Sequence, residues 1–213
     1  MAMRKIKLNK KHKRENSSKW IQRHLNDEYV LKSKAEGYRS RSSYKLLEIE
    51  KRFKFFTKSK NILDLGCAPG GWLQVAKLLT PNDSLIVGID KLEIDQIKDV
   101  KFIKKDIFDS DLTNLLLSCF NEKVDIVMSD MSPNSSGNKS VDHLRIISLV
   151  ERVIEISKTI LKPNGFLISK IFQGGAQGDL IELMKKDLHS IKYIKPKASR
   201  KESAETYLVA KKN

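Results

Sequence analysis

The sequence predicts one α/β domain, in which a mostly parallel central sheet is covered by helices on both faces. Three observations support this prediction. Strand-sized apolar segments alternate with segments whose apolar residues recur at helical spacing, as in repeated βαβ units. Several of these strands end at an acidic residue. A glycine-rich loop joins the first strand to the helix that follows it.

The first predicted elements are helical. The segment Lys19–Lys34 is basic and carries widely spaced apolar residues. A helix through Tyr44–Ile49 follows, and Ser42 or Ser43 is placed to cap its N-terminus.

Strands and helices then alternate along the chain. The predicted strands of the parallel sheet are Asn61–Leu65, Ser84–Ile89, Val100–Ile103, Val124–Ser129 and Phe166–Ile171. The helices between and after them are Trp72–Leu79, Asp111–Phe120, His143–Leu161 and Asp179–Leu188. A polar loop, Ser132–Ser140, precedes the long third helix, and Pro163–Gly165 turns the chain into the fifth strand. Two last strands, near Tyr193 and at Thr206–Ala210, are expected to form an antiparallel edge.

The length and hydropathy are those of a chain with one hydrophobic core. The chain has 213 residues, 40% of them hydrophobic, and a mean hydropathy of -0.41. We expect residues 17–213 to form the domain and the basic residues 1–16 to form a flexible arm. No apolar run approaches the roughly 18 residues of a membrane helix. We therefore expect no membrane association, and we expect a monomer.

Charge favours a nucleic-acid partner. The chain has 41 Lys and Arg against 26 Asp and Glu, which gives a net charge of +15. Counterion release makes such an excess favour nucleic acid over an anionic membrane surface. The basic face is expected to include Arg39, Arg41, Lys197, Arg200 and Lys201. The two cysteines and four histidines show no ligand spacing, so no metal site is expected.

The loop from Asp64 to Trp72 predicts a binding site for an adenosine-containing cofactor. Its glycines allow a sharp turn and a close approach to a ligand. In a doubly wound sheet, such ligands bind beyond the carboxyl ends of the strands. The loop lacks the GK[ST] sequence of a phosphate-binding loop, and Ala68-Pro69 interrupts the GxGxxG pattern.

Two further acidic residues narrow the choice of cofactor. Asp90 ends the second strand, where a carboxylate can accept hydrogen bonds from two ribose hydroxyls. Asp106 follows the third strand, where it can accept from the amine of an adenine. Together they favour S-adenosylmethionine over a dinucleotide as the cofactor. The predicted fold is Rossmann-like, as in methyltransferases that depend on S-adenosylmethionine. The candidate cofactor residues are Gly66, Ala68, Pro69, Gly70, Gly71, Trp72, Asp90, Asp106, Ile107 and Asp130. Trp72 suits core packing and a cofactor wall equally well.

Asp130 and Lys170 are the candidates for the reaction itself. Asp130 follows the fourth strand, and Lys170 stands near the end of the fifth. Adjacent parallel strands would bring both side chains to the rim that holds the cofactor loop. A lysine in an apolar strand is costly unless it is paired. Because a buried ion pair adds little net stability, function is the better explanation for it than a structural salt bridge.

These segments resemble the RrmJ/FtsJ family of ribose 2′-O-methyltransferases. The resemblance covers Ser17–Lys212 and is carried by Gly37–Leu46, Asp64–Trp72, Ser129–Asn134, Ser169–Gly174 and Lys195–Leu208. It implies S-adenosylmethionine as methyl donor and a catalytic tetrad of Lys45, Asp130, Lys170 and Glu205. Lys170 is then the candidate for the base or for the group that stabilises the developing alkoxide. Cys67 departs from the alanine common at its position in the family, and it is small enough to be tolerated.

The resemblance also indicates a substrate. Arg23–Asp27 and Lys195–Tyr207 are most similar to the mitochondrial branch, which methylates a uridine of large-subunit ribosomal RNA. This similarity implies a location in the mitochondrion or another organelle, with the cytoplasm as the alternative.

Three alternative functions stay open. Lys34–Arg39 is also similar to the branch that methylates the tRNA anticodon loop, although Asp130–Asn134 follows the ribosomal pattern. A non-catalytic ribosome-assembly factor that binds RNA is the second alternative, disfavoured by the complete tetrad. An NAD-dependent oxidoreductase is the third, disfavoured by Ala68-Pro69 and Asp106.

Overall fold

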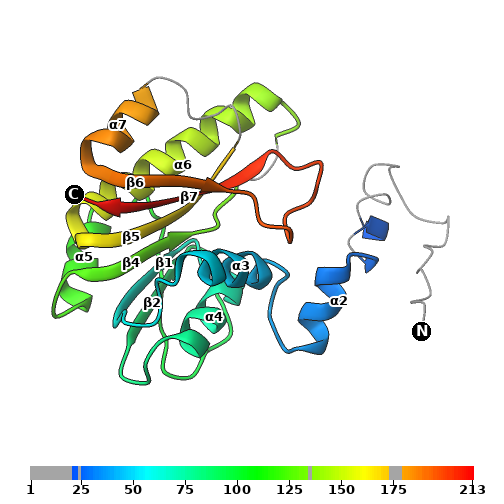
Figure 1. The fold of residues 1–213 in the computed structure, drawn as a ribbon, viewed down its shortest axis with the longest axis horizontal. Helices are drawn as coiled ribbons and strands as arrows, with labels where there is room; N and C mark the ends of the chain where they lie inside the picture. The colour runs from blue at the N-terminus through cyan, green and yellow to red at the C-terminus, as the bar shows by residue number, and fades with distance from the viewer. Residues whose placement is uncertain (1–20, 24, 134–135, 173–178) are drawn as a thin grey trace.

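The computed structural model describes residues 21–23, 25–133, 136–172 and 179–213. Its centre is a seven-stranded sheet with the order β3-β2-β1-β4-β5-β7-β6 (Figure 1). The strands are β1 (Asn61–Leu65), β2 (Leu85–Asp90), β3 (Lys101–Lys104), β4 (Val124–Ser129), β5 (Leu161–Phe172), β6 (Leu188–Ile194) and β7 (Glu205–Lys212). Strands β1 to β5 pair in parallel, and β7 runs antiparallel to both β5 and β6. The predicted fold class and the antiparallel edge are confirmed.

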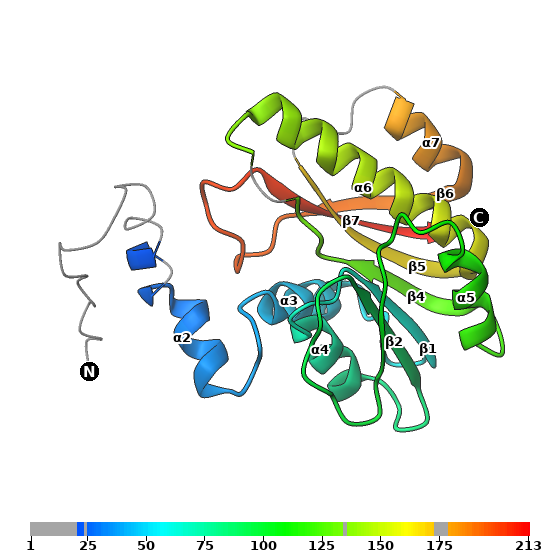
Figure 2. The ribbon, with the colours of Figure 1, turned by 180° about the vertical axis from the view of Figure 1, so that it is seen from behind.

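Helices cover both faces of the sheet (Figures 1 and 2). Helices α3 (Ser43–Phe53) and α4 (Gly71–Leu79) pack on one face, and α5 (Leu112–Cys119), α6 (Lys139–Ile160) and α7 (Asp179–Asp187) pack on the other. Successive strand residues point to opposite faces, so Ile62 joins the α3–α4 core while Leu63 joins the α5–α6–α7 core. Both residues are fully buried, as expected for a sheet covered on two sides.

The strand order creates a switch point between β1 and β4. These two strands are neighbours, but the chain leaves β1 for α4 on one face and leaves β4 for α6 on the other. The carboxyl ends of β1 and β4 therefore open a crevice between diverging connections, which is where ligands of such sheets bind. The loop after β1 and Asp130 after β4 both lie there.

The structure corrects three predictions about where helices begin and how they are capped. The long helix begins at Lys139 instead of His143, because the Asn138 side chain caps it by accepting from the backbone N–H groups of Ser140 and Val141. The segment Lys19–Lys34 is interrupted at Asp27, whose carboxylate caps the shorter helix α2 (Glu28–Ala35). Ser42 occupies the N-cap position of α3 without a side-chain capping bond.

The fifth strand is also longer than predicted. Leu161 already pairs with Val124 of β4, and Phe166 pairs with Ile126, so the chain bulges between these pairs. Asn164 has a φ of 63°, a left-handed conformation that asparagine tolerates. The predicted turn at Pro163–Gly165 is thus an irregularity within β5 instead of its start.

Helix α2 stands beside the layered part of the molecule (Figure 1). Polar contacts of Asp27 link it to Arg41 and to Arg200 in the loop before β7. Among the described residues, every helix is too short or too polar to cross a lipid bilayer. The predicted basic arm, residues 1–16, lies outside the described residues.

Candidate active site

The glycine-rich loop connects β1 directly to α4 at the switch point. Gly66 and Gly70 have φ values of 74° and 102°, which favour glycine. The carbonyl of Ile89 in β2 accepts hydrogen bonds from the backbone N–H groups of Gly66 and Cys67, at 2.8 and 3.0 Å. A Cβ on Gly71 would lie 2.3 Å from the Oγ of Ser40. The loop is therefore held against both the neighbouring strand and the segment that leads into α3.

Asp90 and Asp106, both predicted to bind the cofactor, follow or end the strands next along the sheet, and Asp90 contacts the glycine-rich loop. Asp90 accepts from the backbone N–H of Ala68 at 2.9 Å and from that of Leu92 at 2.8 Å, one bond to each carboxylate oxygen. Asp106 accepts from the N–H of Phe108 at 3.0 Å. Each carboxylate oxygen has two lone pairs, so both side chains keep acceptor capacity for a ligand.

A third carboxylate, Asp64, was not among the predicted site residues. It is 1% exposed, and its Oδ2 has no hydrogen-bond partner among the described residues. Burial, together with the charges of Asp130 and Asp90, raises its pKa well above the ordinary value. An acidic residue within an apolar strand is the signal that could have identified it, just as Lys170 was identified.

Asp64 faces a small pocket between the cofactor loop and the start of α3. The pocket is lined by Ser42, Asp64, Gly66, Cys67, Ala68, Pro69, Gly71, Trp72 and Asp130. Most of these residues belong to the glycine-rich loop, and Asp130 directly follows the neighbouring strand β4. The predicted loop thus forms the wall of a pocket that Asp64 also lines, and Oδ2 of Asp64 has no hydrogen-bond partner among the described residues.

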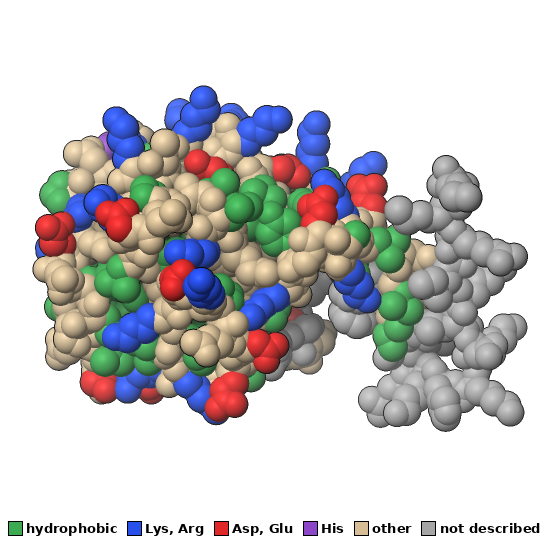
Figure 3. Space-filling model, turned by 90° about the horizontal axis from the view of Figure 1, so that it is seen from below, with side chains coloured by type: hydrophobic (Ala, Val, Ile, Leu, Met, Phe, Trp, Pro, Cys, Tyr) green, Lys and Arg blue, Asp and Glu red, His purple; other side chains and the backbone are tan. Residues whose placement is uncertain are grey.

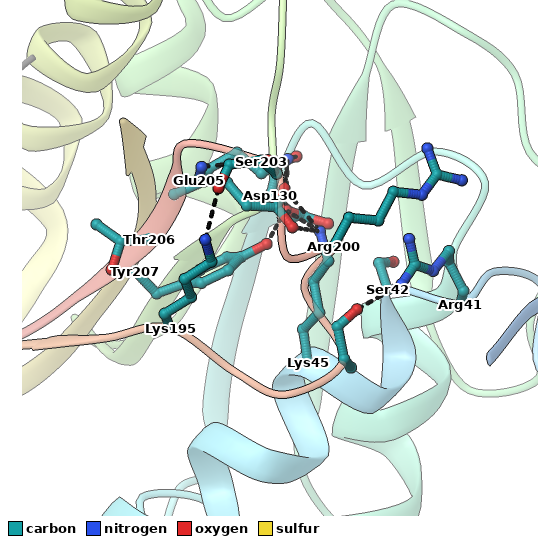
Figure 4. A network of polar contacts seen from close by, with 12 residues as sticks. Arg41, Ser42, Lys45, Asp130, Lys195, Arg200, Ser203, Glu205, Thr206 and Tyr207 are labelled. Carbon is teal, nitrogen blue, oxygen red and sulfur yellow. Dashed lines mark hydrogen bonds and ion pairs between the residues drawn. The ribbon is translucent and has the colours of Figure 1, made fainter. Parts of the chain in front are cut away.

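Lys45, Asp130, Lys170 and Glu205 come together next to this pocket, and we call them the Lys–Asp–Lys–Glu cluster. The Nζ of Lys170 lies 2.6 Å from Oδ1 of Asp130 and donates to its backbone carbonyl at 2.8 Å. The Nζ of Lys45 lies 2.9 Å from Oε1 of Glu205 and 3.8 Å from Oδ1 of Asp130. Lys170 and Glu205 approach to 4.0 Å, which closes the cluster (Figure 4 shows Lys45, Asp130 and Glu205).

The topology explains how residues so far apart in the sequence meet. Asp130 directly follows β4, and Lys170 lies near the end of β5, the parallel neighbour of β4. Strand β7 then runs antiparallel beside β5, with Lys170 opposite Tyr207 and Phe172 opposite Glu205. Residues two apart on a strand share a face, so Tyr207 and Glu205 point to the same side as Lys170. Lys45 reaches this side from α3.

Asp130 is held in its charged form. Burial would raise its pKa, but the charges of Lys170 and Lys45 and hydrogen bonds from Lys170 and Tyr207 lower it below the ordinary value. Two lysines and two carboxylates balance each other in charge. The cluster is therefore a compensated set of charges in which the lysine ammonium groups are held at fixed positions.

The cofactor loop and the cluster both lie within the part of the chain that matches a known protein family. The model of the FtsJ-like methyltransferase family matches residues 38–213, which include both. The chain belongs to the FtsJ-like methyltransferase family. Members of this family depend on S-adenosylmethionine.

Relatives of high identity carry the name ribosomal RNA large subunit methyltransferase E. The protein of this name from Rickettsia conorii is 46% identical over 211 residues, which cover 97% of this chain and 92% of the relative. The one from Rickettsia bellii is 45% identical with the same coverage. The chain therefore spans nearly the whole of these relatives.

Solved structures support the same fold. A Plasmodium falciparum protein described as a ribosomal RNA methyltransferase has a TM-score of 0.73 and 33% identity, with 82% of this chain and 98% of that chain covered. A Lactococcus lactis protein described as a hemolysin has a TM-score of 0.57 and 17% identity, covering 82% of this chain and 88% of that one. The second similarity shows the fold alone.

Tyr207 is a member of the FtsJ-like site that the sequence analysis missed. Its hydroxyl donates to Oδ1 of Asp130 at 2.6 Å, and its ring lies 5.6 Å from the Nζ of Lys45. Burial, with the charges of Asp130 and Glu205, raises its pKa well above the ordinary value, so it remains a neutral donor. The sequence segment Glu205-Thr206-Tyr207 identified Glu205 as a tetrad member but gave no separate sign that Tyr207 belongs to the site.

Trp72 packs in the core and also lines the pocket, and its role as a cofactor wall stays a prediction. Its side chain is 3% exposed and packs 5.8 Å from the ring of Tyr207, as a core residue does. It also lines the pocket, and its Nε1 donates to the carbonyl of Ser42 at 3.0 Å. Trp72 thereby joins α4, the pocket and the start of α3.

The predicted RNA-binding residues separate into two groups. Lys197 and Lys201 are exposed in the loop before β7. Arg41 instead donates to the carbonyl of Ala198 at 2.5 Å and pairs with Asp27 at 3.2 Å, and Arg200 pairs with the same carboxylate at 3.4 Å. The guanidinium group of Arg39 donates only to backbone carbonyls among the described residues. RNA binding by these five residues stays a prediction, and the three arginines already have intramolecular partners.

Proposed function

We propose that this protein transfers a methyl group from S-adenosylmethionine to the 2′-hydroxyl of a ribose, on a uridine of large-subunit ribosomal RNA. One observation carries the proposal: Asp130 belongs both to the pocket of the cofactor loop and to the Lys–Asp–Lys–Glu cluster. A methyl donor in the pocket would therefore lie next to two lysines that can act on a hydroxyl. A cofactor pocket alone would serve many reactions, but this pairing serves methyl transfer to a weak oxygen nucleophile.

The residues present fit S-adenosylmethionine. When bound, this cofactor supplies an electrophilic methyl group on a positively charged sulfur. The buried carboxylate of Asp64, whose Oδ2 has no hydrogen-bond partner among the described residues, suits a cationic ligand, because an opposite charge nearby favours the ionised form. Asp90 would hold the ribose hydroxyls and Asp106 the adenine amine, with the acceptor capacity described above.

The cluster would act by orientation and charge. A 2′-hydroxyl would pass its proton to solvent water as it attacks, so negative charge would develop on its oxygen in the transition state. Lys170 has three N–H donors, and contacts with Asp130 use two of them, so the third can face the substrate. In that position Lys170 stabilises the developing charge. Asp130 and Glu205 hold the two lysines in place and offset their charge.

The ribosomal substrate is supported by the names of the Rickettsia relatives and by the net charge of +15. On the face in Figure 3, Lys and Arg side chains are interspersed with Asp and Glu and form no single continuous patch. Exposed lysines such as Lys197 and Lys201, together with residues 1–16 outside the described part, are our candidates for contacts with RNA phosphates. The mitochondrial similarity, the organellar location and the monomeric state stay predictions.

Labelled methyl donor distinguishes the substrates. We expect label to enter large-subunit ribosomal RNA, free or in ribosomal particles, and to be absent from tRNA incubated in parallel. The Lys170→Ala variant serves as the negative control. Label confined to tRNA would support the anticodon-loop alternative, and no label in any RNA would support a non-catalytic assembly factor.

A further inference from the structure

Arg39 makes an unusual set of contacts for a residue predicted to bind RNA. Its Nη1 donates to the carbonyl of Asp95 at 2.6 Å and to that of Pro69 at 3.3 Å. Its Nη2 donates to the carbonyl of Gln96 at 3.0 Å. Among the described residues, no carboxylate forms an ion pair with it.

These carbonyls belong to the glycine-rich loop and to the segment that follows Asp90, a predicted cofactor residue. Pro69 lies in the glycine-rich loop after β1. Asp95 and Gln96 lie in the exposed segment between β2 and β3, which starts directly after Asp90. The guanidinium group therefore spans the gap between the loop that turns at Gly70 and the segment that leaves Asp90.

The guanidinium group of Arg39 packs closely against Gly70, and a hydrogen bond to Gln74 holds the backbone of Arg39 in place. A Cβ on Gly70 would lie 2.9 Å from Nη1 of Arg39 and 3.1 Å from Cδ1 of Ile97, so glycine leaves the space that the guanidinium uses. The backbone N–H of Arg39 donates to Oε1 of Gln74 in α4 at 2.8 Å, and the Gln74 Nε2 donates to the carbonyl of Gly37 at 2.9 Å. The backbone at Arg39 is thus fixed to α4, the helix that follows the glycine-rich loop.

We infer that Arg39 is a positioning residue for S-adenosylmethionine, which clamps the glycine-rich loop to the segment that follows Asp90. The inference rests on the proposed function and gives Arg39 a different task from contact with RNA phosphate. A planar guanidinium can reach carbonyls on two sides at once, whereas an ammonium group is a single point charge. A lysine at this position would keep the charge and lose the clamp.

Arg39→Lys tests this inference with the whole chain. We expect the dissociation constant for S-adenosylmethionine, measured by calorimetry, to rise about tenfold or more. The KM for S-adenosylmethionine should rise with it, while kcat at saturating cofactor stays close to wild type. Affinity for ribosomal RNA should stay within about twofold, because the charge is retained. Hydrogen exchange should become faster for the amides of residues 91–99.

Lys98→Ala is the matched control, because Lys98 is an exposed cation in the same segment. It should change neither cofactor affinity nor exchange. An Arg39→Lys variant with wild-type cofactor affinity would overturn the inference, as would equal losses in Lys98→Ala. In the wild-type protein, bound cofactor should also protect the amides of 91–99, and absence of this protection contradicts the clamp even if the variant fails to fold. Failure of the wild-type protein to bind S-adenosylmethionine would instead refute the proposed function.

Discussion

Lys170→Ala is expected to abolish methyl transfer while the protein still binds S-adenosylmethionine. Lys170 is the lysine that contacts Asp130 both through the carboxylate and through the backbone carbonyl, at the rim shared with the pocket. Loss of one donor that stabilises a developing oxyanion costs about 10²–10³-fold in kcat. We expect at least this loss, because Lys170 would also orient the hydroxyl.

Cofactor affinity should survive the substitution, because Lys170 does not line the pocket of the glycine-rich loop. Asp130 keeps its hydrogen bond from Tyr207 and its contact with Lys45, so the cluster loses one member without leaving a carboxylate unpaired. Single-turnover kinetics and calorimetry measure the two effects separately. Lys60→Ala, at the opposite end of the sheet, controls for loss of a lysine. Turnover at the wild-type rate in Lys170→Ala would refute the assigned role.

Asp64→Asn should stabilise the cofactor-free protein and weaken cofactor binding. Burial disfavours the charged carboxylate of Asp64, and the neutral amide of asparagine, which has nearly the same shape, does not carry this penalty. Removal of the penalty should raise Tm by about 2–4 °C per kcal/mol for a chain of this size. Loss of the charge that would meet the cationic cofactor should cost about 2–3 kcal/mol of binding, or about 100-fold in Kd.

The sign of the pH dependence follows from the direction of the pKa. Because folding raises the pKa of Asp64, the folded state is penalised as pH rises from the unfolded value, about 3.9, through the folded value. The Tm gain of Asp64→Asn should therefore be small in acid and grow toward neutral pH. Asp130 has a lowered pKa, so Asp130→Asn should have the opposite effect and destabilise the protein at neutral pH. A lower Tm for Asp64→Asn at neutral pH, or unchanged cofactor affinity, would contradict the role of Asp64.

The parts of the site that sit at strand ends were predictable from the sequence. Apolar runs locate the strands, and parallel strands end at one rim, so the pattern of residues suffices to group the glycine-rich loop, Asp90 and Asp130. Lys170 was recognisable because it interrupts an apolar strand. The same reasoning applied to Asp64 would have added it to the site, since its strand is equally apolar.

The contacts of the arginines were not predictable in this way. Arg41 meets Asp27 and the carbonyl of Ala198, and the latter is 157 positions away in the sequence. The net charge of a sequence includes such an arginine as if its side chain were exposed and available to bind RNA. Only the tertiary fold shows that Asp27 binds Arg41 and Arg200 and that Arg39 spans two loops.

Alkaline hydrolysis of the methylated RNA tests the central claim most directly. Alkali cleaves RNA through attack by the free 2′-hydroxyl, so a 2′-O-methyl group blocks cleavage after the modified nucleotide. We expect the wild-type protein to create an alkali-resistant position at a uridine of large-subunit ribosomal RNA, coincident with the transferred label. Lys170→Ala should create none. Label on a base, released with nucleotides that alkali cleaves normally, would contradict the account.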